Sequence, residues 1–193
     1  MELNNIFNVR KTLIELLTDR GYKIDPSNNV NFQEFYIMYE ENNYDILDID
    51  KKIIGYFFKE SKSFSKKDLD NIVEQIKTDY GDEINIIIIL KEKYNITVEK
   101  ELANELYKNV EIFLIKDLII NVTKHNLVPK HIPLSNDEIN LVLKKYNITK
   151  SQLPKISVKD PITKYYGLKS GDMFKIIRTS SASGEYITYR YVR

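Results

Sequence analysis

The chain of 193 residues contains no cysteine and no tryptophan. Without cysteine it can form neither a disulfide framework nor a thiolate zinc site. The only imidazole ligands are His125 and His131, and no further ligands of a plausible set stand near them in the sequence, so we interpret both as hydrogen-bonding side chains. We therefore expect no metal and no other cofactor.

Long apolar runs are also missing. The most apolar run, Ile84 to Leu90, is interrupted by Asn85 and followed by Lys91, which is far short of the roughly 20 residues that a membrane span needs. Near the N-terminus stands the acidic Glu2, and no apolar core of signal-peptide length follows it. With 42% hydrophobic and 30% charged residues, we expect a soluble globular protein that does not bind membranes.

A large charge of one sign is absent from the whole chain, whose net charge is +1, yet the two halves differ. The residues up to Asp117 include 16 lysines and arginines and 23 aspartates and glutamates, which gives a net charge of −7. From Leu118 onward the counts are 13 and 5, a net charge of +8, and the sums 29 and 28 match the whole chain. We therefore expect two domains with different neighbours, residues 1–117 and 118–193.

The N-terminal half alternates helical and strand patterns. Apolar residues from Ile6 to Leu17 recur at helical spacing and end before Gly21, where a left-handed C-cap fits. Strands are expected at 44–49, 53–58, 84–90 and 110–114, and further helices around 32–39, 69–76 and 98–109, the last capped by Thr97. This order predicts an α/β domain in which helices flank a mixed sheet. The run 84–90 predicts a strand buried on both faces.

Four residues of this half imitate a nuclease signature. Asp48 and Asp50 are followed after a strand-length gap by Glu60 and Lys62, which resembles the carboxylates and lysine of restriction-type nucleases. In those enzymes the carboxylates hold a divalent metal and the lysine polarises the attacking water. In a chain with 30% charged residues such spacing arises by chance, and a solvated turn explains it more simply. A metal-dependent nuclease is therefore the weaker, alternative hypothesis.

The C-terminal half predicts a small α+β domain. Ser135 and Glu138 form a capping box ahead of an apolar helical stripe. Asp160 stands before Pro161 as an N-cap residue stands before the first helical turn. Strands are then expected at 173–178 and 186–192, joined through residues 180–184 as a terminal hairpin.

Basic and aromatic residues share this hairpin: Lys175, Arg178 and Arg190 with Tyr186, Tyr189 and Tyr191. Such a set can bind single-stranded nucleic acid by stacking and by phosphate contact. Tyrosine and arginine are also enriched at protein interfaces. These residues alone leave open both a free-standing nucleic-acid-binding module and a protein-docking module.

Several motifs follow one another in the C-terminal half: His125, Val128-Pro129, His131, Leu153-Pro154-Lys155-Ile156, Asp160-Pro161, Tyr165-Tyr166-Gly167-Leu168 and Gly171-Asp172. Their order resembles the C-terminal domain of the small assembly subunit of multisubunit RNA polymerases, which is called subunit 5 in eukaryotes and has a shorter archaeal counterpart. The resemblance covers Asn121 to Arg193. It is looser in the N-terminal half, where Arg10-Lys11-Thr12 and Asp19-Arg20-Gly21-Tyr22 look like the family's first helix and its exit.

The resemblance implies a non-catalytic subunit of a DNA-directed RNA polymerase, without an active site, a cofactor or a small-molecule substrate of its own. Its C-terminal assembly domain would pack against the largest subunit. Its N-terminal jaw domain, similar in fold to nucleases but inactive, would lie beside downstream DNA. Because the archaeal counterpart is essentially the C-terminal domain alone, the attached jaw points to a eukaryotic-type enzyme. That enzyme would be cellular and nuclear, or encoded by a large DNA virus and located in a virion or cytoplasmic viral factory.

The resemblance also suggests site residues. Those expected at the largest-subunit interface are Pro129, His131, Leu153, Pro154, Asp160, Pro161, Tyr165, Gly167, Gly171, Lys175, Arg178, Tyr189 and Arg190. Those expected near DNA are Lys91, Lys93, Tyr94, Asn95, Thr97 and Val98. At this tip the family carries Thr-Pro-Ser-Ala, whereas this chain has Thr97-Val98-Glu99-Lys100. Because a domain of net charge −7 repels a polyanion, we expect weak DNA contact that occurs only within the complex.

Overall fold

The computed structural model describes residues 2–58, 63–180 and 184–193. The chain divides into two compact units, residues 1–120 and 121–193. The division falls after Ile120, whereas the charge count places it after Asp117, because the short helix α5 (Ile115–Leu118) packs against the N-terminal helix α1 (Glu2–Asp19). Residues 118–120 carry no charge, so the net charges of −7 and +8 also hold for these two units.

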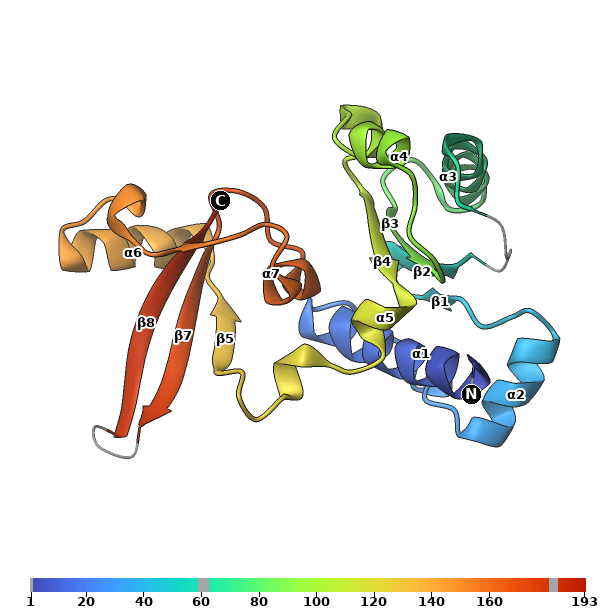
Figure 1. The fold of residues 1–193 in the computed structure, drawn as a ribbon, viewed down its shortest axis with the longest axis horizontal. Coiled ribbons are helices and arrows are strands. Elements are labelled where there is room, and N and C mark those ends of the chain that lie inside the picture. Colours follow the sequence, from blue (N-terminus) through green and yellow to red (C-terminus); the bar gives the residue numbers. More distant parts are fainter. Residues whose placement is uncertain (1, 59–62, 181–183) are drawn as a thin grey trace. The chain divides into compact units, whose positions relative to one another are not determined.

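The N-terminal unit is built on a mixed four-stranded sheet in the order β1-β2-β3-β4 (Figure 1). These strands are β1 (Ile46–Leu47), β2 (Ile53–Phe57), β3 (Asn85–Leu90) and β4 (Val110–Leu114). The pair β1 and β2 is antiparallel, while β2, β3 and β4 are parallel to one another. Parallel strands need crossover connections, and the sequence pattern predicted helices between these strands. The expected mixed α/β arrangement is therefore confirmed.

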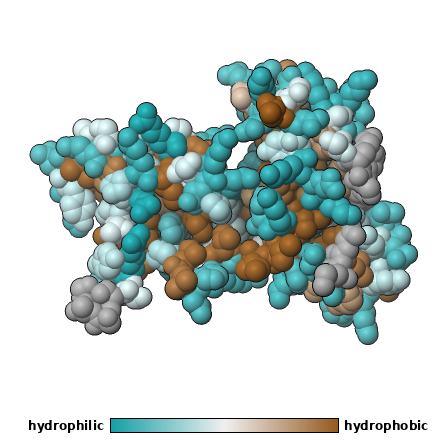
Figure 2. Space-filling view, in the orientation of Figure 1, coloured by the Kyte–Doolittle hydropathy of each residue, from teal (hydrophilic) through white to brown (hydrophobic). Residues whose placement is uncertain are grey.

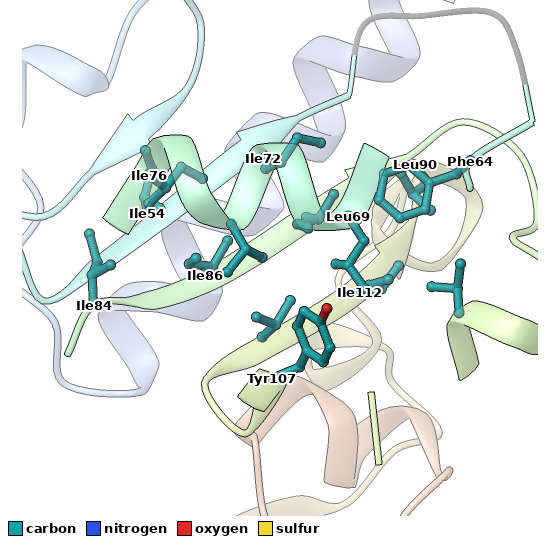
Figure 3. Packing of buried hydrophobic residues seen from close by; sticks show 14 residues of the cluster. Ile54, Phe64, Leu69, Ile72, Ile76, Ile84, Ile86, Leu90, Tyr107 and Ile112 are labelled. Atoms are coloured by element: carbon teal, nitrogen blue, oxygen red, sulfur yellow. The ribbon is translucent and has the colours of Figure 1, made fainter. Parts of the chain in front are cut away.

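Helices cover this sheet. Besides α1 and α5 they are α2 (Phe32–Glu40), α3 (Lys66–Tyr80) and α4 (Ile96–Glu101). Figure 3 shows Leu69, Ile72 and Ile76 of α3 gathered with Ile86 and other sheet residues in one buried cluster. All residues of β3 from Ile86 to Leu90 are at most 1% exposed, so the expected burial of this strand on both faces is confirmed.

Helix α1 packs closely against β2. Leu13 of α1 is fully buried, and a Cβ atom added at Gly55 of β2 would lie 2.5 Å from its Cδ2 atom. Buried Arg10 binds the loops beside the helix: its Nε donates to the Tyr44 carbonyl oxygen at 3.2 Å, and its two terminal nitrogens donate to Asn28 oxygens at 2.6 and 2.9 Å. Burial lowers the pKa of Arg10, while the nearby Asp45 raises it.

Two elements of this unit differ from the sequence expectation. The strand expected at 44–49 is reduced to Ile46–Leu47, because the carboxylates of Asp45 and Asp48 accept backbone amides that would otherwise belong to the ladder. The helix expected at 98–109 begins at Ile96 and ends at Glu101. A separate 3₁₀ turn, Glu105–Tyr107, follows, and the Asn104 side chain caps it by accepting the Leu106 amide at 3.4 Å.

The C-terminal unit has its own four-stranded sheet in the order β5-β7-β8-β6, as expected for a small α+β fold. The strands are β5 (Lys130–Pro133), β6 (Lys155–Ile156), β7 (Met173–Ser180) and β8 (Gly184–Val192). Strand β7 is antiparallel to both β5 and β8, and β6 is parallel to β8. Helices α6 (Asn136–Tyr146) and α7 (Pro161–Tyr166) complete the unit. The expected capping box of Ser135 and Glu138 is present at the start of α6.

Hydrophilic residues make up much of the surface drawn in Figure 2, in keeping with a chain of which 30% is charged. In the described part of the chain, every helix is too short or too polar to cross a bilayer.

The close contact of α1 with β2 predicts that Gly55→Ala destabilises the N-terminal unit. Because Leu13 is fully buried and has little room to move, we expect the free energy of unfolding to fall by about 1–3 kcal/mol in urea titrations. The matched test adds Leu13→Ala, which removes the atoms that the new methyl group would meet. The double variant should then lose less unfolding free energy than the two single variants lose in sum. A loss equal to that sum would contradict the proposed overlap of the new methyl group with Leu13.

Candidate partner interface

The β7 and β8 hairpin gives the C-terminal sheet two chemically different faces. The strands pair without interruption from Met173 with Tyr191 to Ser180 with Gly184, so side chains alternate strictly between the faces. One face, which we call the arginine face, carries Phe174, Ile176 and Arg178 of β7 and Tyr186, Thr188, Arg190 and Val192 of β8. The other, which we call the tyrosine face, carries Met173, Lys175 and Ile177 of β7 and Ile187, Tyr189 and Tyr191 of β8.

The arginine face has an apolar part that packs on α7 and two cations, Arg190 opposite Phe174 and Arg178 opposite Tyr186. Phe174 and Ile176 are fully buried, and the Tyr166 ring of α7 packs edge-on against Phe174 at 5.7 Å. Beyond them the Nε of Arg178 and the Oγ1 of Thr188 are buried, and neither has a hydrogen-bond partner among the described residues. Polar atoms buried in this way are uncommon in native folds, and a bound water or a partner outside the chain would satisfy them.

His131 lies beside these cations. It pairs with Ile176 across β5 and β7, its Nδ1 lies 2.7 Å from the Pro129 carbonyl oxygen, and its ring packs edge-on against Phe174 at 5.4 Å. Burial lowers the pKa of His131; the bond to Pro129 and the charge of Asp160 act in the opposite direction, and Arg190 and Arg178 lower the pKa further. Burial and the two neighbouring cations thus both disfavour the charged form of His131.

A cavity of about 310 Å³ opens next to this histidine. Its lining comes from the segment before β5, from β5 and from α7: Thr123, Val128, Pro129, Lys130, His131, Ile162 and Tyr166. The cavity therefore gathers two residues of the expected interface, Pro129 and His131, on one side of the sheet.

On the tyrosine face, aromatic residues lie toward α6. The rings of Tyr146 and Tyr189 are 6.0 Å apart, and Tyr146 remains 51% exposed. Ile187, farther along β8, is 50% exposed. Lys175 shares this face, and its charge lies near Glu138 at the start of α6.

Other residues expected at the interface have roles inside the unit. Asp160 caps α7 by accepting the Ile162 amide at 2.9 Å, and Pro161 occupies the first turn. Gly167, with φ of 65°, ends the same helix in the left-handed conformation that favours glycine. Tyr165 is only 2% exposed, and its hydroxyl accepts a hydrogen bond from Asn121 at 3.1 Å.

The remaining expected interface residues connect the outer elements. The Pro154 carbonyl oxygen accepts the Tyr191 amide at 3.0 Å, with Leu153 half-buried beside it. Gly171 donates to the Val192 carbonyl oxygen at 3.0 Å, and its own carbonyl oxygen accepts from Lys150 Nζ at 2.6 Å. The structure thus places Arg178, Arg190 and His131 on one face of the sheet and Lys175 and Tyr189 on the other. Pro129 lines the cavity beside His131, and the other expected residues cap helices, pack in the core or connect strands.

Sequence reasoning did not single out Thr188 and Tyr146. The period of two along β8 carries a signal for Thr188, because it places this residue on the same face as Arg190. No comparable signal existed for Tyr146, since its nearness to Tyr189 depends on how α6 crosses the sheet.

The residues expected near DNA lie around the start of α4 in the N-terminal unit. Lys91, Lys93 and Thr97 are exposed, and Asn95 caps α4 through its backbone. Val98 is fully buried in the cluster beneath α3, and Tyr94 packs against that cluster. Lys91, Lys93 and Thr97 are therefore accessible to a partner, whereas Val98 belongs to the core.

The nuclease-like residues do not form a carboxylate pair open to a metal. Asp48 is 3% exposed, and its Oδ1 accepts the Lys52 and Ile53 amides at 2.5 and 2.9 Å, which fixes the turn before β2. Asp50 forms ion pairs with Lys23 and Lys52 at 3.7 and 3.8 Å. Glu60 and Lys62 lie outside the described residues. Within the described ranges, no three histidine, aspartate or glutamate side chains gather in a metal-binding group.

Fold and site together define a two-unit interaction protein, with a basic, aromatic hairpin as its most prominent surface. The family described as RNA polymerase Rpb5, C-terminal domain, matches residues 120–192. The chain belongs to this family of RNA polymerase subunits, because relatives match it over its full length. The nuclease hypothesis has no support from these comparisons.

Three relatives illustrate the match. "DNA-directed RNA polymerases IV and V subunit 5B" of Arabidopsis thaliana is 37% identical, over 100% of this chain and 91% of the relative. "DNA-directed RNA polymerases I, II, and III subunit rpabc1" of Dictyostelium discoideum is 32% identical, over 98% of each chain. "DNA-directed RNA polymerases I, II, and III subunit RPABC1" of Caenorhabditis elegans is 30% identical, over 100% of this chain and 97% of the relative.

The hydrogen bonds of Asp48 predict a role in stability. Asp48→Ala removes the acceptor of two amides and should lower the free energy of unfolding by about 1–3 kcal/mol, whereas Asp48→Asn keeps an oxygen and should cost less. Urea titration measures both.

A plasmid-nicking assay with Mg²⁺ should show no cleavage by the wild-type chain. Cleavage that both Asp48 substitutions abolish would restore the nuclease hypothesis.

Proposed function

We propose that residues 121–193 anchor this polymerase subunit to the largest subunit of its enzyme. The observation that carries the proposal is the arginine face, which carries Arg178, Arg190 and, between them along the sheet, the buried hydroxyl of Thr188. Arginine is favoured at interfaces because its planar guanidinium binds carboxylates with fixed geometry and is weakly hydrated. A net charge of +8 on this unit fits an acidic surface of the partner.

The N-terminal unit would then serve as the jaw module, a nuclease-like fold without nuclease chemistry. Its net charge of −7 disfavours independent DNA binding, because phosphate contacts supply most non-specific affinity. The exposed Lys91 and Lys93 beside α4 can still meet phosphate when a larger enzyme holds the duplex against them. A cellular form would work in the nucleus, and a viral form in a virion or a cytoplasmic viral factory.

Affinity purification of the tagged full-length chain from its native cells tests the anchoring. The two largest polymerase subunits should be present in the eluate, and their absence would overturn the proposal. Arg190→Glu should reduce their recovery at least about tenfold. A tenfold change corresponds to a loss of about 1.4 kcal/mol of binding free energy, which is expected when a desolvated charge is reversed. Lys67→Glu is the matched control: it makes the same charge change at an exposed residue of the N-terminal unit and should leave recovery unchanged. Melting curves check that both variants fold.

Free duplex DNA should bind weakly. At physiological salt we expect the full-length chain to have a Kd above about 100 µM for a short labelled duplex, the weak end of the non-specific range. Fluorescence anisotropy over a series of salt concentrations measures this. Tight binding of DNA or RNA that falls steeply with salt would instead favour the free-standing nucleic-acid-binding module.

A further inference from the structure

The outer side of β8 is an open sheet edge. Strand β6 covers it only at its C-terminal end, where Lys155 and Ile156 pair with Tyr191 and Val192. From Gly184 to Arg190, β8 pairs with β7 on one side, and no strand of the described residues pairs with it on the other. Figure 1 draws the lower part of β8 along the outside of the sheet.

The hydrogen-bond pattern shows which backbone groups face outward. The amides of Tyr191 and Arg193 donate to Pro154 and Ile156, on the outer side, whereas the Val192 amide donates to Asp172, on the β7 side. Because the antiparallel register is continuous, odd and even residues alternate along the strand. The amides and carbonyls of Glu185, Ile187 and Tyr189 therefore point away from β7.

This edge has little of the usual protection. Natural sheets protect their edges with charged residues, above all lysine, with proline, with bulges or with very short strands, but β8 has nine residues in unbroken register, none of them lysine or proline and only Glu185 and Arg190 charged. Its sequence is rich in tyrosine, isoleucine, threonine and valine, which favour strands. Tyr186 and Ile187 are 41% and 50% exposed. Such an edge is suited to receive an additional strand.

The side chains beside the edge define the occupant. A strand added to β8 would alternate between the arginine face, next to Thr188 and Arg190, and the tyrosine face, next to Ile187 and Tyr189. Carboxylates on the first face would pair with Arg190. Apolar residues on the second face would cover Ile187. The β8 edge of a second copy is a poor occupant, because it would bring two units of net charge +8 together.

We propose that an extended segment of another polymerase subunit, with alternating acidic and apolar residues, adds to the outer edge of β8 as a further strand. This inference rests on the proposed anchoring through residues 121–193 and specifies how it occurs. Backbone bonds to Glu185, Ile187 and Tyr189 provide affinity, and Arg190 selects the acidic face of the segment.

Amide hydrogen exchange tests the added strand residue by residue. The outward amides of Ile187 and Tyr189 should exchange at least about tenfold more slowly in the assembled polymerase than in the free chain, because they gain hydrogen bonds. The inward amides of Tyr186 and Thr188 are bonded to β7 in both states and serve as the internal control. Magnetic resonance measures the free chain, and mass spectrometry with electron-transfer fragmentation measures the purified enzyme.

A pair of variants provides the second measurement. Ile187→Pro removes a backbone amide that points away from β7, so the hydrogen bonds between β7 and β8 are kept. This variant should lower recovery of the largest subunits about tenfold. Ile187→Ala keeps the donor and should have a smaller effect. Unchanged exchange at Ile187 and Tyr189 in a chain that does assemble would overturn the added strand and leave the anchoring intact. Failure of the wild-type chain to assemble would overturn both.

Discussion

The pairing of β7 with β8 is the constraint on which the C-terminal unit depends. Eight consecutive residue pairs hold the two strands in one register, so every side chain has a fixed face. This alternation buries Phe174, Ile176 and Val192 under α7 and in the same step places Thr188 and Arg190 beside the open edge. A slip of one residue in β8 would move Thr188, Arg190 and Val192 to the opposite face of the sheet from Phe174 and Ile176. Packing and recognition therefore depend on the same backbone hydrogen bonds.

The N-terminal unit is stabilised by a different principle. Its central strand β3 is buried between helices, and Gly55 lets α1 approach β2 more closely than any side chain there would allow. The acidic residues that could suggest chemistry are used in the turns: Asp45 and Asp48 accept backbone amides, and Asp50 pairs with lysines. Carboxylates engaged in this way stabilise loops, which is consistent with a polymerase subunit that performs no catalysis of its own.

The two units differ most in charge. The acidic unit keeps several of its charges in internal pairs, such as the bidentate contact of Arg20 with Glu111 at 2.8 Å. The basic unit leaves the Arg178 Nε buried and without a partner among the described residues. An arginine left in this state is costly in an isolated domain and favourable against an acidic partner. The charge distribution thus fits the proposed anchoring through residues 121–193.

The sequence by itself determined the order of elements, the caps of α6 and α7, and the burial of β3, because these depend on local spacing and side-chain chemistry. The motif order of residues 121–193 likewise indicated the family before any contact was known. Sequence could not tell that Tyr165 is core whereas Tyr189 lies beside the open edge, since the residue type and the local pattern do not show which side chains the fold covers. Only the tertiary structure decided this, because burial and a free strand edge arise from the order in which distant strands pair.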